Sequence, residues 1–437
     1  MKIAVAGTGY VGLVTGVCLA SKGHHVTCVD VNEEKIELLK QGKSPIYEAD
    51  LEELMAAHKE RLIYTTDYKE AYSDAEVIFI GVGTPEKSDG SANLNYVYAV
   101  AKEIAYAVQR DCVVAVKSTV PIGTNDKVES LIRGHLRQPV LIDVVSNPEF
   151  LAQGSAVRDT LQASRIVIGA DSGRALEIMK AVYKDFEAPI VTADRNSAEM
   201  IKYASNDFLA VKISYVNEIA NLCEIVGADI KKVTEGMGLD PRIGNRFLNA
   251  GIGYGGSCFP KDTRALHWLA NMNDYELKIV KAAIEVNEQQ KLKLVKQLRR
   301  NIDTLAGRTI AVLGLTFKPG TDDLREAPSL VNIPLLLEDG AVIHAYDPVS
   351  CQAFADYLEK YQIPGRETIV YCQTPKAALT DADACLILTE WPQIKSLTGQ
   401  DYIKSMRTPL VFDGRNCYDP VQFRNAGIAY YPIGYGL

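Results

Sequence analysis

The sequence predicts an α/β protein with two doubly wound parallel sheets joined by a helical centre. Short apolar runs alternate with helical patterns in the first part of the chain and again in the last part, as the strands and crossover helices of parallel sheets do. Residues 197–300, between them, are rich in Ala, Lys, Glu and Leu and poor in β-branched runs, which favours helices. We therefore expect two Rossmann-like lobes and the segments 1–193, 194–302 and 303–437.

The first lobe begins with a strand and a tightly packed helix. Ile3–Ala6 is an apolar run that ends at a glycine, as a buried parallel strand does, and a helix follows to about Lys22. The uncharged stretch also resembles a signal-peptide core, but its glycines and threonines favour the buried strand and helix. Further strands are expected at His25–Asp30, Val77–Ile80, Val113–Val116, Leu141–Val145 and Ile166–Ile168, with closure near Val191.

The helical centre is interrupted by the glycine-rich loop Gly236–Gly256. Strand–helix alternation then returns, with strands expected at Thr309–Leu313, Val342–Tyr346, Ala384–Leu388 and Leu410–Asp413. The loop Gly314–Gly320 lacks the pattern G-x-G-x-x-G, so the two lobes are expected to share an architecture and not a site.

The composition excludes several classes of function. The 437 residues, 47% hydrophobic and 23% charged, suit two or three globular domains. A net charge of −8 gives no general attraction to nucleic acid or to an anionic membrane. The nine cysteines show no CxxC and the six histidines no HxxxH spacing. We therefore expect no disulfide framework, no metal site and no membrane or nucleic-acid partner, in a reducing cytoplasm.

A glycine-rich turn after the first strand predicts a dinucleotide site. Gly7-Thr8-Gly9-Tyr10-Val11-Gly12 matches G-x-G-x-x-G, whose glycines permit the tight turn, the approach of a pyrophosphate and close helix–strand packing. The helix N-terminus then faces the phosphates. Asp30 ends the second strand, where a carboxylate binds ribose hydroxyls and repels the 2′-phosphate of NADP, so NAD is expected. Lys35 is near enough to contact the adenosine end.

Three later loops also follow strands, where ligands of open parallel sheets collect. Thr84 and Thr119 are candidates for the nicotinamide side, and Glu149 could position water or act as a base. Ordinary turn chemistry and a solvated acid explain the same residues equally well.

Two pairs of residues at helical spacing suggest catalysis. Lys202 and Asn206 share one helix face and could hold a developing oxyanion, although a surface lysine and amide are commoner. Cys258 follows two glycines at an expected helix start, which favours the thiolate, and Asp262 lies four residues on as an acid–base group. A thiolate can add to an aldehyde and pass through a thioester to an acid. The alternative is a buried structural cysteine.

The second lobe offers two cations beside its first strand end. Lys318 and Arg325 could meet a diphosphate or a cofactor phosphate, or could form a solvated charge cluster.

These motifs together resemble the nucleotide-sugar 6-dehydrogenases over nearly the whole chain. The motifs that carry the resemblance are Gly7–Gly12 with Asp30, Gly83-Thr84-Pro85, Lys117–Pro121, Asn147–Leu151, Lys202-Tyr203 with Asn206, Asp240–Gly244, Gly255–Asp262, and Gly314–Lys318 with Arg325. The resemblance implies an NAD-binding lobe, a helical dimerising centre and a lobe for UDP. It also implies a homodimer and a four-electron oxidation of a UDP-sugar, UDP-glucose above all, through a cysteine thiohemiacetal and thioester that uses two NAD.

The resemblance also implies roles for residues. The implied catalytic residues are Cys258, Lys202, Asn206, Asp262, Thr119 and Glu149. The implied cofactor-binding residues are Gly7, Gly9, Tyr10, Val11, Gly12, Asp30, Lys35, Thr84, Ser118, Thr119, Gln153, Lys261 and Arg325. The implied substrate-binding residues are Glu149, Phe150, Leu151, Lys202, Asn206, Arg242, Phe247, Leu248, Asn249, Gly251, Tyr254, Gly255, Phe317 and Lys318, of which Arg242 is expected to reach the partner subunit's site.

The chain departs from the family pattern at two places. Gln153 stands where the family has a glutamate, and Ala163-Ser164-Arg165 replaces Pro-Asp-Arg. Two alternatives stay open: the same chemistry on GDP-mannose, UDP-N-acetylglucosamine or UDP-N-acetylmannosamine, and a nucleotide-sugar-binding protein without catalysis.

Overall fold

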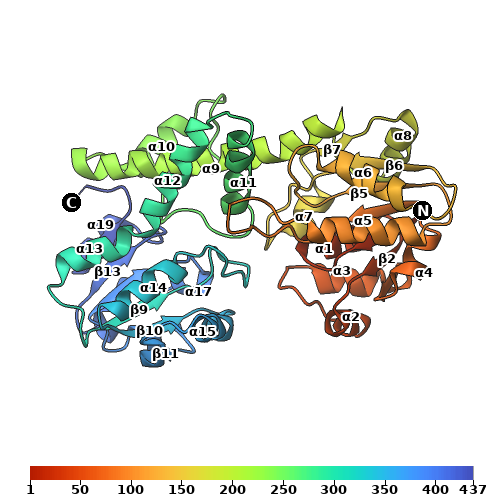
Figure 1. The fold of residues 1–437 in the computed structure, drawn as a ribbon. Coiled ribbons are helices and arrows are strands. Elements are labelled where there is room, and N and C mark those ends of the chain that lie inside the picture. The colour runs from red at the N-terminus through yellow and green to blue at the C-terminus, as the bar shows by residue number, and fades with distance from the viewer. Residues whose placement is uncertain (437) are drawn as a thin grey trace. The chain divides into compact units, whose positions relative to one another are not determined.

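The predicted fold class is confirmed. The computed structural model describes residues 1–436, in which two α/β units each contain one sheet with helices on both faces (Figure 1). The first unit comprises Met1–Ser205 with Trp268–Asn273, and the second Asn206–His267 with the chain from Asp274 onward. The division into segments 1–193, 194–302 and 303–437 stays a prediction.

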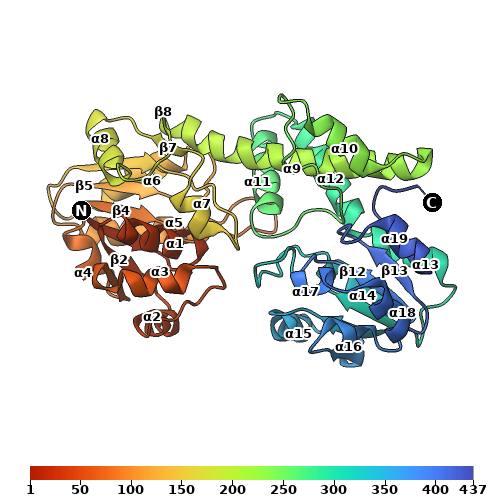
Figure 2. The same cartoon turned by 180° about the vertical axis from the view of Figure 1, so that it is seen from behind.

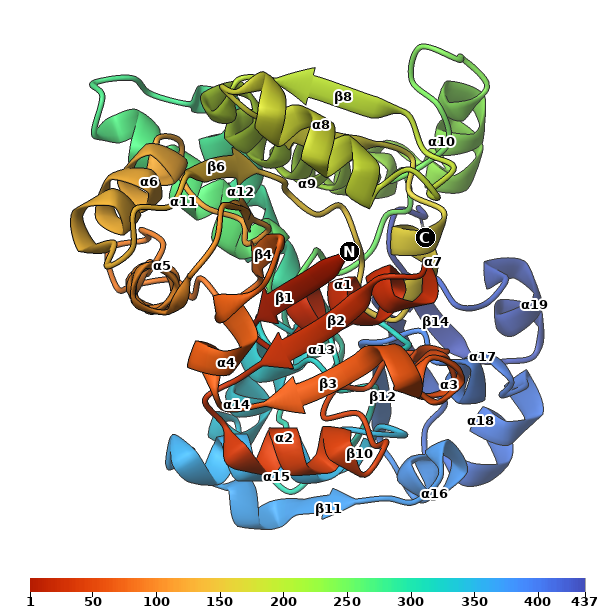
Figure 3. The same ribbon diagram turned by 90° about the vertical axis from the view of Figure 1, so that its right-hand side faces the viewer.

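Within residues 1–436 the sheet of the first unit has eight strands in the order β3-β2-β1-β4-β5-β6-β7-β8. Figure 3 shows β1, β2 and β3 side by side. The bounds are β1 Lys2–Ala6, β2 His25–Val29, β3 Leu62–Thr65, β4 Val77–Ile80, β5 Cys112–Val116, β6 Ile142–Ser146, β7 Ile166–Gly169 and β8 Ile190–Ala193. The neighbours are parallel except β6 and β7, which pair antiparallel at Ser146 and Gly169. We expected a wholly parallel sheet, and the antiparallel pair of β6 and β7 corrects this. The apolar pattern of a buried strand is the same in either strand direction, so the sequence did not indicate the reversal.

Two apolar clusters cover the faces of this sheet. One cluster contains residues of α1, α2, α3, α7 and α8, and the other residues of α4, α5 and α6. The helices are α1 Tyr10–Ser21, α2 Glu33–Lys40, α3 Leu51–Ala57, α4 Tyr68–Ser73, α5 Asn95–Ala107, α6 Thr124–His135, α7 Ala156–Leu161 and α8 Gly173–Val182. The uncharged stretch from Ile3 to Ala20 therefore forms β1 and most of α1 in a core. In the described part of the chain, none of the helices combines the length and the apolarity that crossing a bilayer needs.

Six strands form the second sheet within the described residues, in the order β11-β10-β9-β12-β13-β14, all parallel. Figure 2, turned by 180° from the view of Figure 1, shows this sheet and its helices from the opposite side. The strands are β9 Thr309–Leu313, β10 Val342–Tyr346, β11 Ile369–Tyr371, β12 Ala384–Ile387, β13 Leu410–Asp413 and β14 Ala429–Pro432. The helices of the last part of the chain are α14 Ser329–Glu338, α15 Cys351–Lys360, α16 Pro375–Leu379, α17 Pro392–Lys395, α18 Gly399–Ser405 and α19 Pro420–Asn425.

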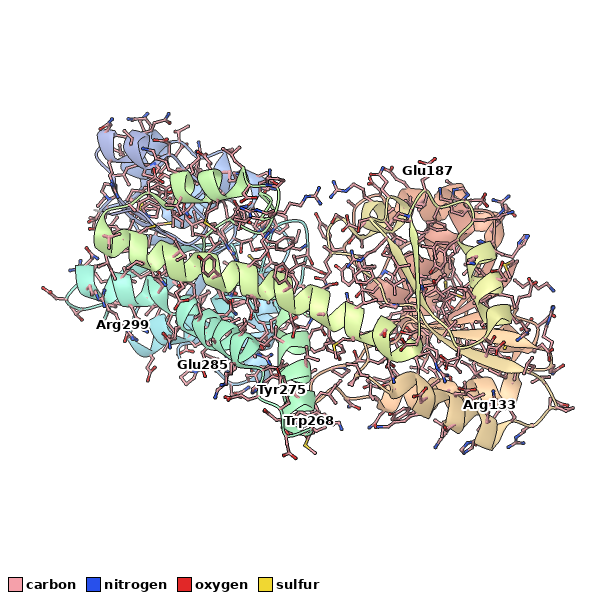
Figure 4. The ribbon with its side chains drawn as sticks, turned by 90° about the horizontal axis from the view of Figure 1, so that it is seen from above. Arg133, Glu187, Trp268, Tyr275, Glu285 and Arg299 are labelled. Carbon is pink, nitrogen blue, oxygen red and sulfur yellow. The ribbon has the colours of Figure 1, made fainter. Side chains whose placement is uncertain are left out.

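The segment between the two sheets is helical, as expected. Its helices are α9 Arg195–Val226, α10 Ile230–Gly238, α11 Phe259–Asn271, α12 Lys278–Lys291 and α13 Lys293–Asn301. Leu294, Val295 and Leu298 of α13 pack in the same apolar cluster as strands of the second sheet. Arg299, labelled in Figure 4, binds Asp339 at 2.7 Å beyond α14, so an ion pair reinforces this packing.

Gly12 is the most crowded residue of the glycine-rich turn. A Cβ at this position would lie 2.0 Å from the backbone oxygen of Gly7. We expect Gly12→Ala to lower the free energy of unfolding by about 3 kcal/mol or more, because backbone atoms must move. Gly134→Ala on α6, where a Cβ meets no atom within 4 Å, should cost nothing and gain up to about 1 kcal/mol of helix propensity. Urea unfolding of both variants checks this, and equal midpoints would contradict it.

Candidate active site

The glycine-rich turn has the shape of a phosphate cradle. Gly7 has φ +97° and donates from its N–H to the Val29 oxygen at 2.7 Å, which fixes the tight turn. Gly9 precedes the first residue of α1, Tyr10, and a Cβ on it would meet no atom within 4 Å. The backbone there is open to a ligand at a helix N-terminus, so the turn fits the pyrophosphate of NAD.

Asp30 lies at the end of β2, beside this turn. Its carboxylate accepts hydrogen bonds from the N–H and Oγ1 of Thr8 at 2.8 and 2.7 Å, and from the N–H of Asn32 at 3.0 Å. Burial opposes the charge, but these bonds and the positive charge of Lys35 outweigh it and lower the pKa of Asp30. Asp30 is therefore a fixed, partly exposed anion, as a ribose-binding carboxylate requires.

The loops after β4 and β5 are bonded to each other. Thr84 donates from Oγ1 to the Thr119 oxygen at 2.9 Å, and Ser118 donates from Oγ to the Val82 oxygen at 2.6 Å. Thr119 is partly exposed, whereas the Ser118 hydroxyl is buried and serves the loop itself. Thr119 is thus accessible to a ligand. The hydroxyl of Ser118, predicted to contact the cofactor, instead bonds to the loop after β4.

Glu149 and Lys202 form a buried ion pair. Their side chains are 6% and 3% exposed, and Glu149 Oε1 lies 2.9 Å from Lys202 Nζ. Glu149 also accepts from the N–H of Leu151 at 2.8 Å. The ring of Phe150 lies between two cations, with Arg165 3.8 Å from its centroid and Lys202 Nζ at 5.3 Å. The structure therefore brings together four of the predicted residues and explains the retained Arg165, which stacks on Phe150.

Gln153 is 8% exposed and lies two residues after Leu151, in the loop that leads to α7. This loop is held by a carboxylate that the sequence did not indicate. Glu48 accepts from the N–H groups of Gly154 and Ala156 at 2.7 Å each, at the start of α7. Gln153 is neutral, and the carboxylate that binds the backbone of this loop is that of Glu48.

Cys258 immediately precedes α11, as the sequence predicts. Its thiol is partly exposed, 3.8 Å from Oγ of Ser257, and its backbone oxygen accepts from the N–H of Asp262 at 2.9 Å. The two glycines before it pass close to another loop: a Cβ on Gly255 would lie 2.3 Å from the Glu326 oxygen, and one on Gly256 2.7 Å from the Phe317 ring. The thiol is thus held at a helix N-terminus by backbone that only glycine allows.

Asp262 is paired from two sides. Asn206 Nδ2 donates to Oδ2 at 2.7 Å, and Lys261 Nζ contacts Oδ1 at 2.5 Å. Asp262 is 1% exposed, so these partners compensate its buried charge. The structure therefore joins two predicted catalytic residues, and it pairs Lys261, predicted to contact the cofactor, with one of them.

Asp207 is a buried acid that the sequence analysis did not single out. Both of its carboxylate oxygens are buried and, within residues 1–436, without a hydrogen-bond partner. Burial and the charge of Asp262 raise its pKa to about 8. At neutral pH it is therefore mostly protonated and adds no second negative charge beside Asp262.

A cavity of about 1510 Å³ opens in the second unit. Predicted substrate residues that line it are Phe247, Leu248, Asn249, Gly251, Tyr254, Gly255, Phe317 and Lys318. Buried amides fix this loop: Asn217 and Asn287 accept from the N–H groups of Gly251 and Tyr254 at 2.8 Å each, and Gln290 donates to the Gly251 oxygen at 2.7 Å. The loop is therefore rigid without regular secondary structure.

Arg415 is a cavity residue that the sequence analysis missed. It follows β13 and donates to the backbone oxygens of Phe317 and Leu388 at 2.8 Å each. Its side chain is 14% exposed and lies 3.4 Å from Glu390 Oε2, and these contacts fix a guanidinium at the cavity whose planar shape suits a phosphate. Its position at the carboxyl end of a parallel strand, in Asp413-Gly414-Arg415, was the available signal.

Two predicted arginines lie apart from the lining of this cavity. Arg242 pairs with Asp240 at 2.6 Å and is 87% exposed, and Arg325 pairs with Asp323 at 2.7 Å and is 62% exposed. Within residues 1–436, no group of three His, Cys, Asp or Glu side chains is arranged for a metal ion.

The second lobe repeats the backbone of the first but uses its carboxylate internally. Gly314 has φ +90° and donates to the Tyr346 oxygen at 2.7 Å, as Gly7 does to Val29. Asp347, at the position of Asp30, accepts from the N–H of Leu315 at 2.8 Å and from Trp391 Nε1 at 3.0 Å. Asp347 is 5% exposed, whereas Asp30 is partly exposed, so the carboxylate of Asp347 is enclosed by the protein, which agrees with one dinucleotide site and not two.

The fold and these residues define a dinucleotide-binding protein with a thiol at a helix start. The chain matches three domains of the UDP-glucose/GDP-mannose dehydrogenase family: the NAD binding domain over residues 1–187, the central domain over 196–289 and the UDP binding domain over 311–420. The chain therefore belongs to this family, and its cofactor is NAD.

Relatives extend over the whole chain. UDP-glucose 6-dehydrogenase YwqF of Bacillus subtilis is 50% identical over 436 residues, 99% of this chain and 98% of the relative. The UDP-glucose 6-dehydrogenase of Rhizobium meliloti is 44% identical, with 99% of each chain covered. A UDP-glucose dehydrogenase structure from Pyrobaculum islandicum has a TM-score of 0.92 at 39% identity, covering 99% and 98% of the two chains. A UDP-D-ManNAc dehydrogenase from Pyrococcus horikoshii has a TM-score of 0.87 at 28% identity, with full coverage of both.

Proposed function

We propose that this protein oxidises UDP-glucose to UDP-glucuronate with NAD, through a thioester on Cys258. The observation that carries the proposal is the thiol at the start of α11, held by glycines and followed by the Asn206–Asp262–Lys261 group. Full-length relatives named UDP-glucose 6-dehydrogenase at up to 50% identity support the substrate.

The proposed reaction needs one nucleophile and one water. The primary alcohol of the sugar is oxidised to an aldehyde, and the Cys258 thiolate adds to its carbon to form a thiohemiacetal. Oxidation of this adduct gives a thioester, whose carbon–sulfur bond breaks when water attacks, releasing the acid and the thiolate. NAD, when bound, accepts one hydride in each oxidation.

The other proposed catalytic residues handle charge and protons. Lys202 and Asn206 would stabilise the oxyanion, and Asp262 would exchange a proton near the sulfur. Thr119 and Glu149 would position the water, and Glu149 would accept its proton. The proposal requires Cys258 and the nicotinamide to act on the same sugar carbon.

Each ligand has a proposed set of binding groups, one in each unit. The glycine-rich turn would hold the pyrophosphate of NAD, and Asp30 its ribose. Lys318 and Arg415, which both line the cavity of the second unit, would hold the diphosphate of the UDP-sugar.

Counting NADH tests the proposal. Limiting UDP-glucose with excess NAD should yield two NADH per sugar, measured by absorbance at 340 nm. One NADH with release of an aldehyde would exclude the thioester. Binding of the sugar nucleotide without NADH would show a binder that does not catalyse. Rates on GDP-mannose, UDP-N-acetylglucosamine and UDP-N-acetylmannosamine would decide between the substrates left open.

We also propose a homodimer through the helical centre. Phe208, Tyr215 and Leu222 recur every seven residues along α9 and are 64%, 50% and 51% exposed. Seven residues are about two helical turns, so these three side chains lie on one face of α9. Leaving an apolar face of this kind exposed to water is costly, and contact with a second copy would cover it. A cytoplasmic location stays a prediction.

Leu222→Asp is expected to convert the dimer into a monomer. A charge on an apolar contact face would be buried without a partner when the dimer forms. Light scattering during size exclusion measures the mass, with Val370→Asp on β11, where Val370 is 49% exposed, as the control that stays dimeric. A wild-type monomer at micromolar concentration would contradict the dimer.

A further inference from the structure

Lys117, directly after β5, is a buried amine that the mechanism above does not use. It is 9% exposed, and its Nζ donates to Asn147 Oδ1 at 3.2 Å and lies 3.4 Å from the Tyr183 hydroxyl. Tyr183 donates to the same Asn147 oxygen at 2.6 Å. Neither partner carries a charge. A buried ammonium held by neutral groups is costly unless an anion lies nearby.

The nearby anion is Glu149. Lys117 and Glu149 line one cavity of about 50 Å³, room for a few water molecules. Burial is the largest influence on Lys117 and lowers its pKa to about 8; Glu149 opposes this shift and Lys202 adds to it. The interior of the first unit therefore holds two amines, those of Lys117 and Lys202, near the carboxylate of Glu149.

We propose that Lys117 is a positioning residue, a second cation that keeps Glu149 ionised when Lys202 turns from Glu149 to the oxygen of the substrate. The inference rests on the proposed function. Lys202 cannot fully compensate Glu149 and an oxyanion at once. A buried carboxylate that loses its partner takes up a proton, and it can then no longer accept one from water. Lys117 has no contact with substrate in this role.

The surroundings of Lys117 leave few other groups that carry charge. The Cys18 thiol and the Tyr183 phenol have pKa values raised by burial and are neutral at working pH. The remaining charged groups at the cavity are Glu149, Asp159 and Arg165, with Lys202 bound to Glu149. Asp159 is bonded to Ser155 Oγ at 2.7 Å and Arg165 stacks on Phe150.

The direction of the pH effect follows from the lowered pKa. Lys117 is charged below about pH 8 and neutral above it, whereas in the unfolded chain it stays charged to its ordinary pKa of 10.5. Its support of Glu149 is therefore present below pH 8 and is lost as the pH rises through 8. Removal of the charge should matter most on the acidic side.

A measurement without turnover tests the charge coupling. In the whole protein with 13C-labelled lysines, one Cε resonance should titrate near pH 8 and disappear in Lys117→Met. Glu149→Gln should move this titration to lower pH, because the carboxylate that favours the ammonium is gone. Titration at the ordinary pH of a lysine, or no response to Glu149→Gln, would overturn the proposal.

Rates test the consequence. Lys117→Met should move the acidic limb of kcat against pH upward by about one unit, a tenfold loss on that limb, and should approach the wild-type rate above pH 8. Lys117→Arg should restore the limb. Tyr183→Phe, which removes a hydrogen bond but no charge, is the matched control and should leave the limb in place. An unmoved limb in Lys117→Met, or an equal shift in Tyr183→Phe, would overturn the proposal. A wild-type protein that forms no NADH would refute the proposed function alone, since the resonance still reports the coupling.

Discussion

Cys258→Ser is expected to abolish sustained NADH formation, with kcat lowered by about 10⁴-fold or more. A serine hydroxyl at neutral pH is a far weaker nucleophile than a thiolate, and removal of a nucleophile commonly costs this much. The first oxidation does not form a bond to sulfur, so at most one NADH per active site should appear before the reaction stops. A rapid-mixing absorbance trace separates this first NADH from turnover.

The control for Cys258→Ser is another partly exposed cysteine of the same unit. Cys372, which follows β11, lies outside the cavity lining and carries no proposed role. Cys372→Ser should leave kcat within twofold of wild type. Sustained turnover by Cys258→Ser at more than a hundredth of the wild-type rate would refute the covalent route.

The buried strands were predictable because their patterns are local. β1, β4 and β5 are continuous apolar runs between turns, and each lies where the sequence places a strand. The edge strands β3, β8, β11 and β14 were not expected, because they are short and each has exposed or half-buried side chains. Pairing with a neighbour forms such strands, and a single segment of sequence does not record that neighbour.

The residues of the site also divide into those that a local pattern predicts and those that it does not. Gly7 to Gly12, Asp30 and the helix start at Cys258 follow from spacing along one segment. The clamps from Asn217 and Asn287 come from helices far along the chain from the loop they hold, and an isolated Asn has no distinguishing pattern. Lys117 and Arg415 each follow a strand, but the groups they bond to come from other segments, which the local pattern does not record. Arg242 lies in a motif and its side chain is 87% exposed, so its expected role at the partner subunit's site stays a prediction.

Lys202→Met is expected to lower kcat by about 10² to 10³-fold and also to destabilise the first unit. The rate falls because a donor to the developing oxyanion is lost. The stability falls because Glu149, 6% exposed, keeps a charge without its partner, which commonly costs about 3 to 5 kcal/mol when one member of a buried pair is removed. Lys117 offsets part of this cost, so we expect the lower end of the range. NADH formation and urea unfolding measure the two effects.

A double variant separates catalysis from stability. Lys202→Met with Glu149→Gln removes both charges and should recover most of the free energy of unfolding, because no unpaired carboxylate remains buried. It should not recover kcat, since the cation for the oxyanion is still missing. Recovery of kcat together with stability would mean that Lys202 acts only by holding Glu149, and the oxyanion role would then be wrong. Because Glu149→Gln also removes the group that positions the water, the comparison is with Glu149→Gln alone. A further loss of kcat in the stable double variant, beyond the loss in Glu149→Gln, assigns Lys202 to the transition state itself.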